Sequence, residues 1–180
     1  MNFIIYDLEA TCWKGRPISK QQETIEIGAL KIDSYGDVLG EFSSFIRPKI
    51  NPYLSAFCQE LTTIEQTDVD RAPGFESAIE AFQDWIGIFD EDYKLCSWGN
   101  FDKQLLQQDC DLHKLEGEWL EQHINIKRQY REILRLHRPR GLKHAVETAG
   151  YEFTGTQHRA ISDAQNLAKI FLKYLDEWRY

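Results

Sequence analysis

Two acidic residues stand inside an apolar run near the start of the chain. The segment IIYDLEAT, residues 4–11, carries Asp7 and Glu9 two positions apart. Side chains alternate along a β-strand, so these two carboxylates point to the same side of it. Holding two like charges together on a buried strand is unfavourable unless a cation lies between them. Divalent cations such as Mg²⁺ and Mn²⁺ bind carboxylate oxygens, so the spacing predicts a metal site.

Two later segments supply the rest of this chemistry. Asp102 in SWGNFD begins a helix directly after an apolar segment, and HRAISD holds His158 and Asp163. Each alone has an ordinary role, because acids at helix starts complement the helix dipole and a lone histidine is commonly a loop residue. Together, four carboxylates can hold two cations about 3.5–4 Å apart, which clamp the oxygens of a phosphodiester. A histidine that titrates near neutrality can take the proton from the attacking water.

The hydrophobic pattern predicts the elements that must position these residues. Short apolar or alternating segments indicate strands, and apolar residues at helical spacing indicate helices. Ser162 and Gln165 match a capping box, so Asp163 is expected as the first residue of the last helix. The expected strands are residues 2–8, 23–34, 37–48, 93–98 and 124–127, and the clearest helices are 75–86 and 163–178. This order predicts an α/β domain with a mixed sheet covered by helices.

Length and composition fit a single domain covering residues 1–180. With 42% hydrophobic residues and five tryptophans, the chain can build a core without disulfides or structural metals. We expect no signal peptide and no membrane span, because no cationic start precedes a long apolar run. The four cysteines form no C-x-x-C pair, which predicts reduced thiols, a cytoplasmic location and no zinc site. No obligate protein partner is predicted.

Charge is distributed unevenly along the chain. Residues 127–143 hold seven basic residues and one acid, a local charge of +6 on a chain whose net charge is −8, so the remaining residues carry −14. Such a basic stretch on an acidic body can bind phosphates locally. The alternative is a solvated face of an amphipathic helix. We expect part of this stretch, with Arg138 and Arg140 in an exposed turn, to follow the backbone of a nucleic acid.

The three motifs together resemble those of the DEDDh 3′-to-5′ exonucleases. In that family the first segment reads D-x-E, the second carries one Asp after a strand, and the third reads H-x4-D. YDLEATCW, SWGNFDKQLL and residues 45–72 further resemble the ERI-type branch and the bacterial KapD-like proteins. This resemblance implies a ribonuclease-H-like fold: a five-stranded mixed sheet in the order 3-2-1-4-5 with strand 2 antiparallel. It also implies metal-dependent removal of nucleoside 5′-monophosphates from a 3′ end.

The resemblance assigns roles to individual residues. Asp7, Glu9 and Asp163 would bind two Mg²⁺ or Mn²⁺ ions, with Asp7 bridging them and Asp102 supporting the second. His158 would be the general base. The backbone at Ala10 and Thr11 would meet the terminal ribose. The residues expected to hold the last base, on which aromatic faces can stack without reading sequence, are Phe57, Leu61 and Trp98.

Several alternatives stay open at this level. The substrate with a free 3′ end could be RNA or single-stranded DNA, since no residue declares a contact to the 2′-OH. An internally cutting ribonuclease and a non-catalytic binding module are the other two interpretations. Many family members carry Thr-Gly-Ile near the bound 3′ nucleotide, where this chain has residues 62–64, Thr-Thr-Ile. A side chain in place of glycine narrows the approach of a backbone there.

Overall fold

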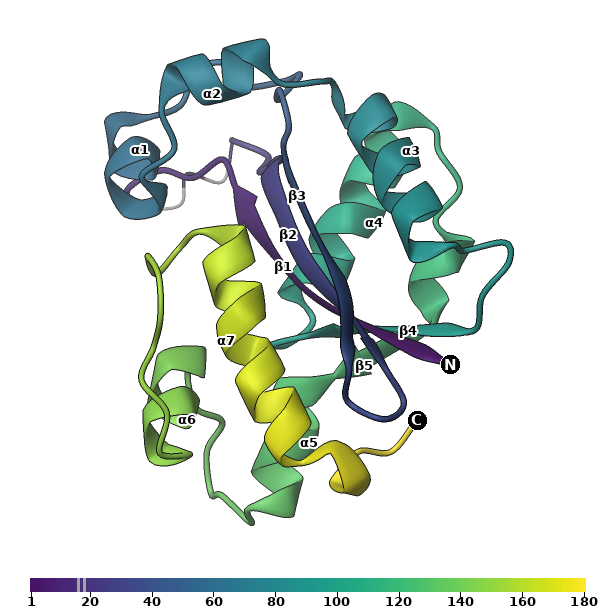
Figure 1. The fold of residues 1–180 in the computed structure, drawn as a ribbon. Coiled ribbons are helices and arrows are strands. Elements are labelled where there is room, and N and C mark those ends of the chain that lie inside the picture. The colour runs from purple at the N-terminus through teal and green to yellow at the C-terminus, as the bar shows by residue number, and fades with distance from the viewer. Residues whose placement is uncertain (16, 18) are drawn as a thin grey trace.

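A single mixed sheet organises the protein, described here by a computed structural model for residues 1–15, 17 and 19–180. Its strand order is β3-β2-β1-β4-β5, with β2 antiparallel to its neighbours and β4 parallel to both β1 and β5 (Figure 1). The strands are β1 (Asn2–Ala10), β2 (Thr24–Asp33), β3 (Val38–Phe45), β4 (Tyr93–Ser97) and β5 (His123–Asn125). The order and orientation implied by the family resemblance are confirmed.

The described chain contains seven α-helices. They are α1 (Ala56–Thr62), α2 (Gln66–Arg71), α3 (Phe75–Ile86), α4 (Phe101–His113), α5 (Ile126–Ile133), α6 (Leu142–Thr148) and α7 (Ala160–Lys173). Of these, α3 and α4 pack on one face of the sheet and α5, α6 and α7 on the other, whereas α1 and α2 lie beyond the end of the strands. Short 3-10 turns lie at Glu118–Glu121 and Leu175–Glu177. None of the helices described is both long and apolar enough to cross a bilayer.

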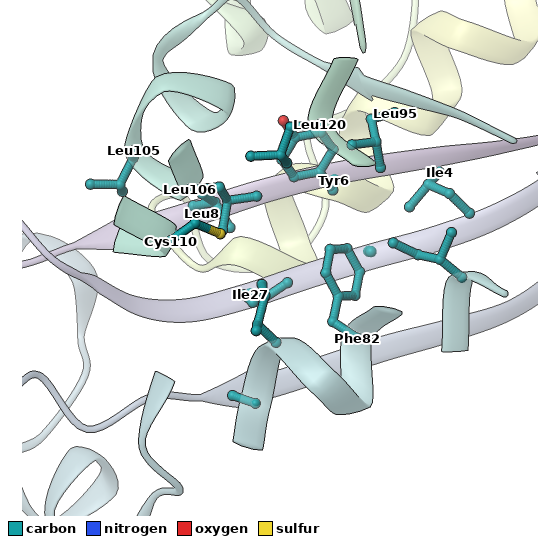
Figure 2. Packing of buried hydrophobic residues seen from close by; sticks show 14 of the residues in the cluster. Ile4, Tyr6, Leu8, Ile27, Phe82, Leu95, Leu105, Leu106, Cys110 and Leu120 are labelled. Atoms are coloured by element: carbon teal, nitrogen blue, oxygen red, sulfur yellow. The ribbon is translucent and has the colours of Figure 1, made fainter. Parts of the chain in front are cut away.

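Two apolar cores lie on opposite faces of the sheet, and β1 contributes alternate residues to each. Ile4, Tyr6 and Leu8 pack with residues of α3 and α4 on one face (Figure 2). Phe3 and Ile5 pack on the other face with residues of α6 and α7. Since β1 alternates, the positions that follow Phe3 and Ile5 on the second face are 7 and 9. The two acids of the first motif therefore face α7.

The last helix begins three residues earlier than the sequence predicts. α7 starts at Ala160, and the expected capping box of Ser162 with Gln165 is wrong, because Arg159 precedes the first turn. The Ala160 N–H donates instead to the Glu26 carboxylate of β2 at 2.9 Å. A carboxylate from another strand thus satisfies a free N–H group of the helix start, so no local cap is needed. Asp163 consequently lies one turn inside α7, and its N–H donates to the Arg159 carbonyl at 2.9 Å.

The other predicted boundaries hold to within about three residues, except that the last helix, expected to reach residue 178, ends at Lys173 and is followed by the 3-10 turn Leu175–Glu177. The expected strand at 124–127 is displaced, since β5 ends at Asn125 and α5 begins at the next residue. The Asn125 side chain accepts a hydrogen bond from the Arg128 N–H at 2.9 Å, which is an N-cap that ends the strand.

The two ends of the chain lie near each other at the N-terminal end of β1 (Figure 1). The rings of Phe3 and Tyr180 lie 4.7 Å apart between centroids. Asp7 and Glu9 occupy the opposite end of the same strand.

Candidate active site

The two acids of β1 lie where this strand leaves its neighbour. β4 pairs with β1 only from Asn2 to Ile5, so the ladder between them ends before Asp7. Asp102 follows β4 in the first turn of α4 and is buried. After burial, the charge of Asp102 is the strongest influence that raises the pKa of Asp7. Both residues line the same cavity, so the structure brings the second motif to the first.

His158 and Asp163 approach the same acids from the α7 side. Ligand atoms of Glu9, His158 and Asp163 all lie within 4.8 Å of one another. The His158 N–H donates to the Asp163 Oδ2 at 3.0 Å, so the chain between them folds back on itself. His158 has a backbone φ of 62°, in the left-handed region that costs a residue with a side chain about 1–2 kcal/mol. The histidine is thus held in a conformation that its own segment does not favour.

A buried ion pair fixes this segment to the sheet. Glu26 lies directly across from Glu9 in the β1–β2 register and is 1% exposed. Its carboxylate accepts two hydrogen bonds from the Arg159 guanidinium, at 2.9 Å from Nη2 and 3.2 Å from Nε, besides the one from Ala160. Bidentate arginine–carboxylate pairs fix orientation as well as charge. The residue next to His158 is therefore anchored to the strand beside the acids.

Close backbone contact adds to this anchor. Gly28 faces the start of α7, and a Cβ at this position would lie 2.1 Å from the Ile161 backbone nitrogen. Only glycine leaves room for the helix to come so near β2. Asp7 lies opposite Gly28 in the strand register, so the approach brings α7 directly against the acids.

Burial raises the pKa of every acid of the motifs, and repulsion by neighbouring carboxylates adds to this at Asp7, Glu9 and Asp163. The pKa of Asp7 lies well above its ordinary value because of burial and then of Asp102, Asp163 and Glu9. Burial, followed by the charge of Asp163, raises the pKa of Glu9 to about 9. Burial raises the pKa of Asp102 and of Asp163 to about 6. The ionised forms of these four carboxylates are therefore unfavourable in the metal-free protein, and a bound cation would stabilise them.

Burial has the opposite effect on the histidine. It lowers the pKa of His158 below its ordinary value, because a partly buried imidazole loses the solvation of its charged form. The neutral imidazole therefore predominates at neutral pH. Only this form can accept a proton.

The five motif residues line one cavity of about 890 Å³. Four of the five residues expected to bind the terminal nucleotide by its base or ribose also line it: Ala10, Phe57, Leu61 and Trp98. Phe57 and Leu61 project from α1 and are 38% and 36% exposed. Apolar side chains at the mouth of a polar site are suited to stack or pack on a base.

Two of the expected contacts, Thr11 and Trp98, have other partners in the structure. Thr11 is buried and does not line the cavity, and its N–H donates to the Glu23 carbonyl at 2.8 Å. Trp98 lines the cavity, but its indole Nε1 donates to the Arg140 carbonyl at 3.0 Å and its ring packs on Tyr130. Trp98 thus forms part of the cavity wall, and its side chain contacts Tyr130 of α5 and the backbone at Arg140.

Phe101 is a cavity residue that the sequence reasoning missed. It lies directly before Asp102, lines the same cavity and is 49% exposed. Its adjacency to the second motif is the signal that could have identified it. Its exposure makes it better suited than Trp98 to stack on a base.

The loop after α1 carries the departure from Thr-Gly-Ile. Thr63 ends α1 with φ 59° and ψ 15°, the left-handed conformation that glycine adopts without strain. The backbone shape is therefore the one a glycine would take, although a threonine occupies it. The threonine side chain is exposed.

The donor set fits a divalent cation. Asp7, Glu9, Asp102 and Asp163 offer only oxygen ligands, which hard cations such as Mg²⁺ prefer. The guanidinium of Arg159 is already engaged by Glu26 and cannot neutralise all four. Within the described residues, none of these four acids forms an ion pair within 4 Å with a basic side chain.

Comparison with known proteins gives the family. The Exonuclease family model (RNase_T) matches residues 4–171. The chain belongs to the exonuclease family. ERI1 exoribonuclease 2 of Danio rerio is 33% identical over 188 residues, covering 93% of this chain and 34% of that protein. The 3'-5' exoribonuclease 1 of Homo sapiens is 30% identical over 181 residues, covering 96% of this chain and 52% of that protein.

A solved exonuclease domain has nearly the same fold. The nuclease domain of 3'hExo, a DEDDh family member solved bound to rAMP, superposes with a TM-score of 0.91 at 30% identity, covering 99% of this chain and 94% of that one. The resemblance to DEDDh exonucleases of the ERI type, predicted from three motifs, is confirmed. Exonucleases of this kind depend on a divalent metal. The chain spans only about a third to a half of the length of the two relatives named above.

Proposed function

We propose that this chain is a metal-dependent exonuclease that removes nucleotides one at a time from the 3′ end of RNA. The observation that carries the proposal is the clustering of four carboxylates with raised pKa around a neutral histidine in one cavity. The exoribonuclease names of the ERI-type relatives favour RNA over DNA as the substrate.

The carboxylates and the histidine would have separate roles in hydrolysis. When bound, two Mg²⁺ ions, or Mn²⁺ in their place, would supply charge stabilisation to the attacked phosphate and to the attacking water. Asp7, Glu9, Asp102 and Asp163 would hold them. His158 accepts a proton as the water oxygen forms its bond to phosphorus. The bond from phosphorus to the 3′ oxygen of the preceding nucleotide breaks, and this oxygen takes up a proton from water to become the new 3′ hydroxyl. The products are a nucleoside 5′-monophosphate and a chain shortened by one.

The terminal nucleotide would enter between two apolar walls. Phe57 and Leu61 form the wall on α1, and Phe101 and Trp98 form the other. Contacts of this kind accept any base, because every base offers a flat face. The proposed enzyme therefore trims without regard to sequence at the last position.

The test is the incubation of a 5′-labelled RNA oligomer with the protein and Mg²⁺ or Mn²⁺. We expect a ladder that shortens from the 3′ end, release of 5′-monophosphates and complete loss of activity in EDTA. A circular RNA should survive, since an exonuclease cannot begin on it, and cleavage of the circle would indicate an internally cutting ribonuclease.

A DNA oligomer of matched sequence distinguishes the substrates. Faster hydrolysis of the DNA would favour a DNA exonuclease of the proofreading or repair type. Binding of both oligomers without hydrolysis of either would indicate a non-catalytic binding module.

A further inference from the structure

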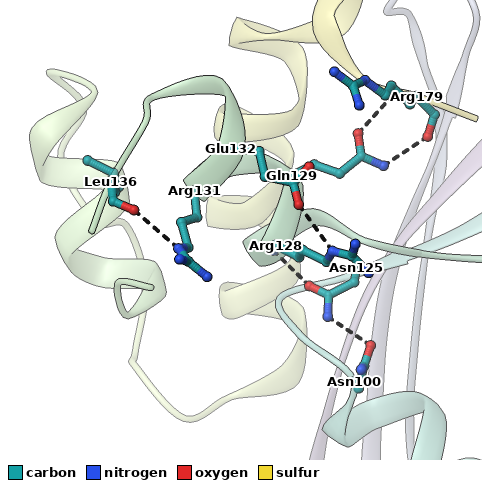
Figure 3. A network of polar contacts seen from close by, with 8 residues as sticks. All are labelled: Asn100, Asn125, Arg128, Gln129, Arg131, Glu132, Leu136 and Arg179. Atoms are coloured by element: carbon teal, nitrogen blue, oxygen red, sulfur yellow. Dashed lines mark hydrogen bonds and ion pairs between the residues drawn. The ribbon is translucent and has the colours of Figure 1, made fainter. Parts of the chain in front are cut away.

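The basic stretch of residues 127–143 is exposed and mostly free of acidic partners. Six of its seven basic side chains are exposed: Arg128, Arg131, Arg135, Arg138, Arg140 and Lys143. Figure 3 shows Arg128 paired with Glu132 and Arg131 bonded to the Leu136 carbonyl. Within the described part of the chain, the basic residues from Arg135 to Lys143 form no ion pair within 4 Å. Their charges are available to an anion.

The free end of this stretch reaches the wall of the cavity. Gly141, Leu142 and Lys143 line the same cavity as the motif acids. The hydrogen bond from Trp98 to the Arg140 carbonyl holds the preceding residue at the cavity wall. A strand of nucleic acid that leaves the cavity on this side meets Lys143 and Arg140 first.

The segment that contains α1, which contributes Phe57 and Leu61 to the cavity, has a net negative charge. The segment 56–71, which contains α1 and α2, carries four acids and one arginine. The acids are Glu60, Glu65, Asp68 and Asp70, and three of them are exposed. A polyanion passing over α1 and α2 would meet like charge, whereas on the α6 side every charged residue from Arg135 to Lys143 is basic.

We propose that Arg138, Arg140 and Lys143 form a phosphate track for the nucleotides upstream of the cleaved end. This inference rests on the proposed function and extends it to the substrate class: single strands of several nucleotides, held by their backbone and not by their bases. Exposed arginines and lysines contact phosphates without reading sequence. Arg138 and Arg140 do not line the cavity, so a dinucleotide bound there is not expected to reach them.

The experiment compares Arg138→Gln/Arg140→Gln with wild type in binding a fluorescent 12-nucleotide RNA in EDTA at several salt concentrations. Removing one phosphate interaction lowers the slope of log K against log salt by about 0.7, so the double variant should show a slope smaller by about 1.4. Lys94→Gln/Lys114→Gln removes the same charge away from the cavity and should leave the slope unchanged. An unchanged slope in the arginine variant, or an equal drop in the lysine variant, overturns the track.

Hydrolysis gives an independent readout. With Mg²⁺, the arginine variant should raise KM for the 12-nucleotide RNA and leave both kcat and the hydrolysis of a dinucleotide unchanged. An equal defect on the dinucleotide overturns the track, because it would place the arginines in the cleavage site. Lack of hydrolysis by the wild type would contradict the proposed function but not the phosphate track, because the salt dependence of binding is measured without catalysis.

Discussion

The acids of β1 and the residues delivered by α7 reach the same cavity by different means. Asp7 and Glu9, the strand half of the site, are set by the alternation and register of β1, which pairs with β2 along its length. His158 and Asp163, the helix half, lie outside the sheet. They are held by the Glu26–Arg159 pair, by the close approach at Gly28 and by their own mutual hydrogen bond. The strand half is therefore intrinsic to the sheet, and the helix half depends on a few specific contacts.

Breaking the strand half should have the largest effect on activity. Asp7→Asn removes a ligand charge without changing the strand, and bound metal supplies several kcal/mol of charge stabilisation. Since each 1.36 kcal/mol is a factor of ten, a loss of roughly 6 kcal/mol should lower turnover by more than about 10⁴-fold. Thermal melting of the metal-free variant should give a Tm no lower than that of the wild type, because a repelling buried charge has gone. Turnover close to that of the wild type would rule out Asp7 as a metal ligand.

In the helix half, His158→Asn removes the imidazole and keeps a residue that can adopt the same left-handed backbone conformation. Asparagine tolerates the left-handed region better than most residues, so the fold around position 158 should persist. Turnover should fall by on the order of 10²–10⁴-fold, the usual contribution of a general base. Mn²⁺ affinity, measured by calorimetry on the same sample, should remain within a few-fold. A loss of affinity that accounts for the whole loss of rate would make His158 a ligand instead.

Substitutions in the Glu26–Arg159 ion pair, which anchors the helix half, should lower turnover less. The two single variants should differ in their effect on Mn²⁺ affinity. Glu26→Gln leaves the Arg159 charge unneutralised beside Glu9, so Mn²⁺ affinity should fall. Arg159→Gln leaves the Glu26 carboxylate unpaired, so Mn²⁺ affinity should not fall. Both variants should lower turnover about 10–100-fold, the range seen when supporting partners of metal ligands are removed.

The measurements are calorimetry with Mn²⁺ and turnover with a saturating RNA oligomer. A purely structural ion pair would weaken cation binding equally in both variants, which contradicts the expectation. The double variant should recover cation affinity without recovering turnover.

The smallest expected effect is on stability as a function of pH. The folded protein raises the pKa of Asp102 and Asp163 to about 6 and that of Glu9 to about 9. A raised carboxyl pKa means that the folded state binds more protons than the unfolded state between the unfolded and the folded pKa. Stability is therefore lost as pH rises from about 4 to about 6 for Asp102 and Asp163, and on to about 9 for Glu9, which alone of these three acts above pH 6. In EDTA, Tm should fall between pH 6 and 9, and added Mg²⁺ should restore more at pH 9 than at pH 6. Parallel curves with and without Mg²⁺ would contradict a cation site at these acids, and Glu9→Gln should flatten the EDTA curve.

The strand half was almost fully predictable from the sequence. Period-two alternation in IIYDLEAT places Asp7 and Glu9 on one face, and the same alternation assigns the apolar residues to two cores. The order of the sheet followed from the family resemblance that these motifs carry. Local pattern was sufficient because the geometry of a strand is local.

The helix half was predictable only as a set of residues. The H-x4-D spacing identified His158 and Asp163, but the predicted start of α7 was wrong because its cap, Glu26, is on a distant strand. The choice between Trp98 and Phe101 likewise depends on Arg140, which contacts Trp98 only in the folded chain. Contacts between distant segments decide both cases, and no local pattern encodes them. Glu26 itself could have been noticed, since it is another acid within an apolar strand.

Because Phe3 and Tyr180 meet at the end of β1 remote from the acids, the order of the segments is not what keeps the site assembled. A short linker between the two termini, with new ends opened in the exposed turn between β2 and β3, would preserve every strand and every residue of the cavity. Such a circular permutant should fold and retain cleavage. For the same reason, a dye or surface tether attached at either terminus would leave the cavity open, which makes single-molecule observation of trimming practicable.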